Sequence, residues 1–193
     1  MSIALAEKAV AALLSTLQSY TPGEIALINA ERNDGNSLPY VEAFEPGRPG
    51  KMYGDTTQIN GWCESTSLPQ WTSNGAGNWN NSLTNTVNGR HECVVLLRHT
   101  NREALTGYQM EARSQRYAAA MVRVLLAVQD LGLTGVGYLQ VTGVQYGVAE
   151  DGETKRLIHS VALTVTVDLS EDSINEGVAG SGGIPTLTIQ IRA

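Results

Sequence analysis

The chain has 193 residues, a formal net charge of −6 and a hydrophobic content of 42%. This length fits one α+β domain with an insertion better than two full domains. The acidic balance argues against a dedicated nucleic-acid-binding protein, which usually presents a basic face, but it does not exclude a channel through which DNA slides. The N-terminal apolar segment contains Glu7 and Lys8 and lacks a basic leader. We therefore expect no signal peptide, and the absence of any run of about 20 apolar residues predicts no membrane span.

The first 44 residues predict one helix and two short strands. Residues 2–20 place apolar side chains at helical spacing. The sequence Thr21-Pro22-Gly23 is expected to end this helix, because proline lacks a backbone donor and glycine bends freely. The apolar run at residues 24–29 and the alternating residues 40–44 are typical of strands.

Residues 45–90 differ from the rest in being polar and rich in glycine and asparagine. This range also holds all three tryptophans, Trp62, Trp71 and Trp79. Solvated linkers rarely contain tryptophan, so we interpret the range as an ordered insertion that folds over the domain or packs between subunits. The tryptophans could form the small core of this insertion, anchor a subunit contact, or stack on sugars.

The second half predicts a strand, a long helix and two further strands. Residues 92–98 are typical of a buried central strand, and residues 110–131 repeat apolar side chains every three or four positions. Arg113, Arg116 and Arg123 are expected on the outer side of this helix. Residues 139–148 and 157–169 alternate apolar and polar side chains, which indicates an antiparallel sheet with one covered face. Leu187, Ile189 and Ile191 alternate in the same way and predict a terminal strand, either at a sheet edge or paired with another chain.

The predicted fold class is therefore α+β, a mostly antiparallel sheet packed against two main helices, with a long polar insertion that contains the tryptophans. Residues 1–193 are expected to form a single domain, with residues 45–90 as an insertion within it.

No motif indicates a catalytic, metal or cofactor site. Cys63 and Cys93 are too few for a disulfide framework and are expected to be isolated thiols, and the three histidines are scattered. His99 and the nearby Glu103 could act as a catalytic pair, but a histidine near a strand end is more often on the surface or hydrogen-bonded. The Gly-Ser-Gly-Gly stretch at residues 180–183 lacks the lysine of a phosphate-binding loop. We expect no catalytic residues, no metal and no cofactor.

The charged loop between the last two predicted strands of the second half is the main candidate for contacting a partner. Residues 149–156 carry five charged side chains and contain Asp151-Gly152, a favoured hairpin turn. The candidate interaction surface comprises four of these charged residues and the three tryptophans, namely Glu150, Asp151, Lys155, Arg156, Trp62, Trp71 and Trp79.

This order of elements resembles the tail-terminator, or tail-completion, proteins of long-tailed bacteriophages. The matching features are the first helix, the long helix over residues 113–131, and a strand through Val144-Gln145-Tyr146. An acidic turn, Glu150-Asp151-Gly152, and the alternating strand over residues 161–169 follow. The resemblance covers the first helix and roughly residues 92–169; the tryptophan-bearing insertion and the glycine-rich C-terminal segment lie outside it.

The resemblance implies a structural virion protein with no enzymatic activity. Members of that family form a ring, commonly a hexamer, at the head-proximal end of the tail tube, where they stop tube growth and join the tail to the neck. The implied partners are copies of the same chain, the tail tube protein and neck or connector proteins, while DNA passes through the lumen without specific binding. The implied location is the tail or neck of the virion, after assembly in the host cytoplasm. Another neck, connector or tube subunit, or a glycan-binding or host-surface-binding module that uses the tryptophans, remains an alternative.

Overall fold

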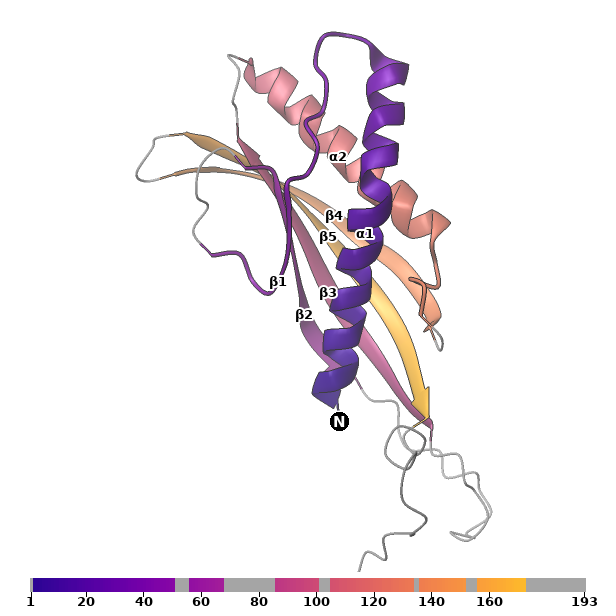
Figure 1. Cartoon of the computed structure of the whole chain (residues 1–193). Coiled ribbons are helices and arrows are strands. Elements are labelled where there is room, and N and C mark those ends of the chain that lie inside the picture. The colour runs from indigo at the N-terminus through magenta and orange to yellow at the C-terminus, as the bar shows by residue number, and fades with distance from the viewer. Residues whose placement is uncertain are drawn as a thin grey trace, which may run out of the picture.

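Five strands form one sheet, and two helices cover one of its faces (Figure 1). The structure is a computed structural model that describes residues 2–50, 56–67, 86–100, 105–133, 136–151 and 156–172. The strand order is β1-β2-β3-β5-β4, and every neighbouring pair is antiparallel except β1 with β2. The predicted α+β class is confirmed. In chain order the elements are α1 (Ser2–Arg32), β1 (Ala43–Pro46), β2 (Gln58–Ser67), β3 (Thr86–Thr100), α2 (Gly107–Ala127), β4 (Val136–Glu150) and β5 (Leu157–Asp172).

Strand β5 shows why the sheet has one covered face. Its alternate residues Val161, Leu163, Val165 and Val167 are fully buried, while the residues between them are only half-buried. Successive side chains of a strand point to opposite faces, so the helices cover the face that carries these four side chains. The neighbouring β3 lies between β2 and β5, which confirms the predicted central strand at residues 92–98.

Helix α1 is longer than predicted. It continues through Pro22 to Arg32, so the expected stop at Thr21-Pro22-Gly23 and the expected strand over residues 24–29 are both wrong. Leu13, Leu17, Ile25 and Ile28 are all buried and follow one another at helical spacing on both sides of the proline. Burial of this continuous stripe offsets the backbone hydrogen bond that proline cannot donate.

The first two strands also differ from the prediction. Strand β1 covers residues 43–46 rather than 40–44, and β2 lies inside the range interpreted as an insertion. The first residues of β3 fall in that range too, so parts of residues 45–90 belong to the main sheet. Residues 68–85 lie outside the described residues, and the single-domain organisation with its insertion stays a prediction.

Helix α2 begins with a capping box. The Thr106 side chain accepts a hydrogen bond from the Gln109 backbone, and the Gln109 side chain accepts one from the Thr106 backbone. These bonds satisfy donors that a helix N-terminus would otherwise leave unpaired. The helix ends at Ala127, four residues before the predicted end, and Gly132 in the following turn has a φ of 66°.

Arg113 of α2 is buried, which corrects its expected place on the outer side of the helix. Its Nε donates a 2.8 Å hydrogen bond to Asn36 Oδ1, and Asn36 Nδ2 donates to the Gln109 carbonyl at 2.9 Å. Arg116 donates to the Asn36 carbonyl and pairs with Asp34. The hydrogen bond from Arg116 lowers the pKa of Asp34 to about 2. This network fixes the segment after α1 against α2 because it pairs each buried polar group. Arg123 is half-exposed, as expected.

Candidate interaction surfaces

Strand β4 forms one edge of the sheet and joins β5 in a long hairpin (Figure 1). The Asp151 backbone N–H donates a 2.8 Å hydrogen bond to the Arg156 carbonyl, which holds the two strands together at the turn. Glu150 and Arg156 are exposed and Asp151 is half-exposed, so these three predicted residues lie together at the hairpin end. Lys155 lies outside the described residues. The antiparallel pairing of β4 with β5 agrees with the two strands predicted on either side of this loop, and residues 152–155 lie outside the described residues.

Three apolar side chains of β4 remain exposed on the helix-bearing face of the sheet. Val144, Tyr146 and Val148, here called the β4 stripe, expose 40%, 53% and 60% of their surfaces. They lie opposite Leu163, Val161 and His159 of β5, which are buried. Directly paired residues point to the same side of a sheet, so the stripe continues the core laterally beyond the cover of the helices.

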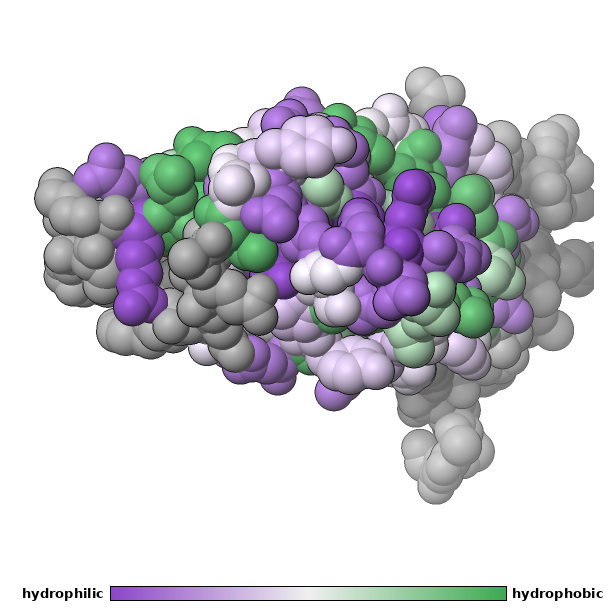
Figure 2. All heavy atoms as spheres, turned by 90° about the horizontal axis from the view of Figure 1, so that it is seen from above, coloured by the Kyte–Doolittle hydropathy of each residue, from purple (hydrophilic) through white to green (hydrophobic). Residues whose placement is uncertain are grey.

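The neighbouring β5 residue Leu157 is also exposed and extends this apolar area toward the hairpin end. In the view from above, one group of hydrophobic residues lies toward the side to which the hairpin projects in Figure 1, and other hydrophobic residues lie elsewhere on this face (Figure 2). Contiguous exposed apolar surface of this kind marks a contact site more often than isolated exposed side chains do.

The backbone of β4 is suited to pairing with another strand. Among the described residues it is the last strand of the sheet, and it is 15 residues long. Its only charged residue is Glu150, at its end, and it contains no proline. Two β-bulges, between Val136 and Tyr138 and between Val141 and Gly143, interrupt the first part of the strand, and its pairing with β5 is regular from Gly143 to Glu150. Proteins usually protect edges with lysine, proline, bulges or a short strand, so the regular part of β4 is the part suited to strand pairing. The geometry therefore supports a partner along β4.

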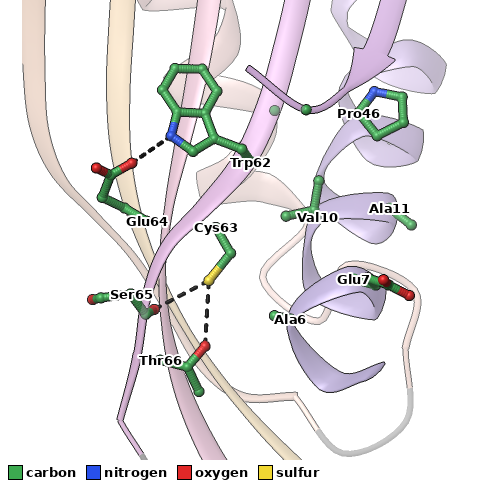
Figure 3. Close-up of a pocket in the computed structure, with 12 residues that line it drawn as sticks. Ala6, Glu7, Val10, Ala11, Pro46, Trp62, Cys63, Glu64, Ser65 and Thr66 are labelled. Atoms are coloured by element: carbon green, nitrogen blue, oxygen red, sulfur yellow. Dashed lines mark hydrogen bonds between the residues drawn. The ribbon is translucent and has the colours of Figure 1, made fainter. Parts of the chain in front are cut away.

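A second apolar surface lies at the opposite side of the sheet, between α1 and β2. The groove has a volume of about 660 Å³ and is lined by Ala6, Val10 and Ala11 of α1 together with Pro46 and Cys63 (Figure 3). Strand β1 pairs with β2 only from Gln58 to Gly61, so β2 beyond Gly61 has no partner on that side among the described residues. The groove thus lies beside an open strand edge.

Trp62 borders this groove and is engaged with neighbouring side chains (Figure 3). Its indole N–H donates a 2.6 Å hydrogen bond to Glu64 Oε2, and the Arg48 guanidinium lies 5.4 Å from its ring centroid. The hydrogen bonds from Trp62 and Arg48 lower the pKa of Glu64. The structure therefore places Trp62 at the opposite edge of the sheet from the charged hairpin. Trp71 and Trp79 lie outside the described residues.

The two cysteines are neighbours, which corrects the expectation that they are isolated. Cys63 of β2 lies directly opposite Cys93 of β3, and both are unlinked. Burial raises the pKa of the Cys93 thiol to about 12, so this thiol is un-ionised at neutral pH and is a poor nucleophile.

His99 lies in a buried cluster rather than in an open site. Its Nε2 is 2.9 Å from Ser114 Oγ, and its ring contacts the rings of Tyr117 and His159. Burial is the main cause that lowers the pKa of His99 to about 3, so the ring is neutral. A serine and a histidine at this distance can form a nucleophile and base, but Ser114 on α2 and His99 on β3 are both buried, and neither lines the groove between α1 and β2. The hydrogen bond between them joins α2 to β3.

Across the described ranges, no group of three or more histidine, cysteine or acidic side chains could hold a metal ion. Within the same part of the chain, neither helix is apolar enough over sufficient length to cross a membrane. Glu103, the other member of the suggested catalytic pair, lies outside the described residues.

Sequence reasoning located the charged hairpin but missed the exposure of the β4 stripe. The alternation of Val144, Tyr146 and Val148 is visible in the sequence, but alternation shows only that these side chains share a face. Whether that face is covered depends on where α2 ends and how far it reaches across the sheet.

No protein-family model matches the chain, and no curated protein sequence matches it. Among solved structures, the chain is similar to one described as the virion of a native gene transfer agent (GTA) particle. The identity is 11%, the TM-score is 0.31, and the similarity covers 80% of this chain and 95% of that chain.

Proposed function

We propose that this chain is a structural virion protein that acts as a tail terminator, forming a ring at the head-proximal end of a phage tail tube. The sequence resemblance described above suggests this role. The observation that carries it furthest is the β4 edge, which combines a regular strand from Gly143 to Glu150 with exposed apolar side chains. A surface of this kind suits contact with another protein rather than catalysis.

Ring formation requires each subunit to use two different surfaces. In a head-to-tail contact, one surface of a subunit meets another surface of the next, and the array closes when the rotation between subunits allows it. The β4 stripe on one side of the sheet would supply the first surface. The family resemblance suggests six subunits, and burial of the stripe would supply the apolar core of each contact.

The charged hairpin end then has a separate role. Glu150, Asp151, Lys155 and Arg156 would contact the tail tube protein or the neighbouring subunit, because charged groups at the rim of an interface set orientation and partner choice. A net charge of −6 keeps phosphates from adhering to the lumen, so DNA would pass without specific binding.

The experiment is removal of the gene from the virus or prophage that encodes this chain, followed by electron microscopy of the particles. Loss of a tail terminator should give tubes of uncontrolled length and heads without tails. Complementation with the Tyr146→Asp variant should fail, because the charge would be buried in the ring contact. Tyr108→Asp is the matched control, since Tyr108 is 81% exposed at the start of α2, and it should restore normal tails.

The same images separate the alternatives. Loss of a connector would leave tails of normal length detached from heads, and loss of a tube subunit would leave no tubes. Intact virions without the gene would refute a structural role altogether. The glycan-binding alternative gains no support from Trp62, because its ring lies beside Arg48 and its N–H is bonded to Glu64.

A further inference from the structure

We propose that the C-terminal residues 186–192 of the same chain occupy the groove between α1 and β2 as an added strand. This inference does not depend on the tail-terminator role. It concerns the edge of β2 from Trp62 to Ser67, which has no strand partner on that side within the described ranges and lies beside the apolar wall formed by Ala6 and Val10. An extended segment placed there would continue the line along which β1 pairs with β2 and would cover the apolar wall.

The length and position of the remaining chain fit this groove. Asp172, where the described chain ends, is level with Thr86 of β3, and Ser67 of β2 is level with Arg90 of β3. The groove entrance beside Ser67 is therefore displaced from Asp172 by four residues along the strands and by three strand spacings across the sheet. This corresponds to a separation of roughly 20 Å. Residues 173–185 extend to about 45 Å, so the linker reaches the groove with length to spare.

The groove also opens at the correct end of the molecule. The N-terminus of α1 and the end of β5 lie at the same end of the sheet (Figure 1). The chain leaving β5 would enter the groove near Ser67 and run toward Gly61, antiparallel to β2. Antiparallel pairing along the edge of β2 needs no further crossover connection.

The chemistry of the segment matches both sides of the groove. Leu187, Ile189 and Ile191 would face the apolar wall, while Thr188 and Gln190 would face the other side. The lining includes the exposed Glu7 and no basic side chain, whereas Glu64 is already paired with Arg48 and the Trp62 indole. The only charged side chain in residues 184–193 is Arg192, so Glu7 is the lining charge that it would complement.

The β-bulge between Cys63 and Ser65 limits how many ladder hydrogen bonds the segment can form. Apolar side chains inserted into the groove would therefore contribute more to binding than backbone pairing. This makes the identity of the inward-facing residues the property to test.

Cys63 provides a natural reporter because it lines the groove and is only half-buried. Single cysteines are introduced at positions 187 to 191 in a Cys93→Ala background, which prevents oxidation of Cys63 onto Cys93. After mild oxidation, peptide mapping identifies the disulfides. We expect Leu187→Cys, Ile189→Cys or Ile191→Cys to link to Cys63 within one chain, whereas Thr188→Cys and Gln190→Cys do not. Equal linking at all positions, links only between chains, or no links would overturn the proposal.

A second measurement uses the native cysteines and does not rely on the Cys93→Ala background. Thiol labelling of Cys63 in the full-length protein should accelerate about tenfold in Ile189→Asp, because the charge removes the segment from the groove. Gln190→Asp, on the opposite side of the segment, is the matched control and should label at the wild-type rate. Equal rates in all three proteins would show that the segment does not cover Cys63.

Discussion

Replacing His99 by glutamine should remove a defined part of the pH dependence of stability. Burial, with smaller contributions from His159 and Arg113, lowers the pKa of His99 from the ordinary value of 6.5 to about 3. Below pH 6.5 the unfolded chain binds a proton that the folded chain refuses. The contribution of the neutral His99 to the free energy of unfolding is therefore fully present above pH 6.5 and is lost progressively as the pH falls toward 3.

The magnitude follows from the difference between the two pKa values. One pKa unit corresponds to about 1.4 kcal/mol, so lowering the pH from 7 to 5 should decrease the free energy of unfolding by about 2 kcal/mol through His99 alone. His91 and His159 also have lowered pKa values and contribute in the same direction. The wild-type protein should lose more than 2 kcal/mol over this range.

The assay is urea unfolding followed by circular dichroism at pH 7 and pH 5. His99→Gln should lose about 2 kcal/mol less than the wild type between the two pH values, whatever its absolute stability, because glutamine does not titrate. The same decrease in both proteins would mean that His99 accepts a proton in the folded state. That result would refute its burial as a neutral structural residue and would reopen a catalytic role.

Three further predictions concern packing, and all are measured by chemical unfolding. Leu163→Asp should cost several kcal/mol because the side chain is fully buried, whereas Thr164→Asp on the other face should cost less than half as much; equal losses would contradict the assigned faces. Arg113→Met should cost about 2–4 kcal/mol because it leaves buried partners unpaired. Arg123→Met, on the exposed side of α2, should cost less than about 1 kcal/mol. A larger loss in Arg123→Met than in Arg113→Met would refute the burial of Arg113. Gly61→Val should destabilise by about 1–3 kcal/mol because a Cβ there lies 3.1 Å from the Leu14 side chain, and an unchanged midpoint would mean that α1 is not packed this closely on β2.

Local patterns predicted the elements whose stability depends on their own sequence. Strand β5 was found because Val161 to Val167 alternate regularly, and α2 because its apolar residues repeat at helical spacing. In the structure, the apolar residues of both patterns are buried because one side of each element faces the core.

Elements that depend on distant partners were missed. Asn60 and Gly61 do not indicate a strand, but both are buried in β2, where Gly61 allows Leu14 of α1 to approach closely. Arg113 suggested an exposed helix face, and its partner Asn36 is 77 residues away. The proline in α1 suggested a stop because its local effect was weighed without the tertiary packing that spans it.

The same distinction between local sequence and distant packing applies to the candidate surfaces. The charged hairpin was predictable because turn residues and charge mark it locally. The exposure of the β4 stripe and the open edge of β2 were not, since both depend on how far α2 and β1 extend across the sheet. The residues most suited to contact with a partner are therefore apolar ones that the sequence assigned to the core.

The most direct test of the central claim is the solution mass of the purified wild-type protein compared with Val148→Asp, measured by size-exclusion chromatography with light scattering. We expect the wild type, with a chain mass of 20.6 kDa, to form a species several times heavier, and Val148→Asp to remain folded but dissociate toward the monomer. A wild-type protein that stays at the mass of one chain at every concentration, or a variant that assembles as the wild type does, would contradict it.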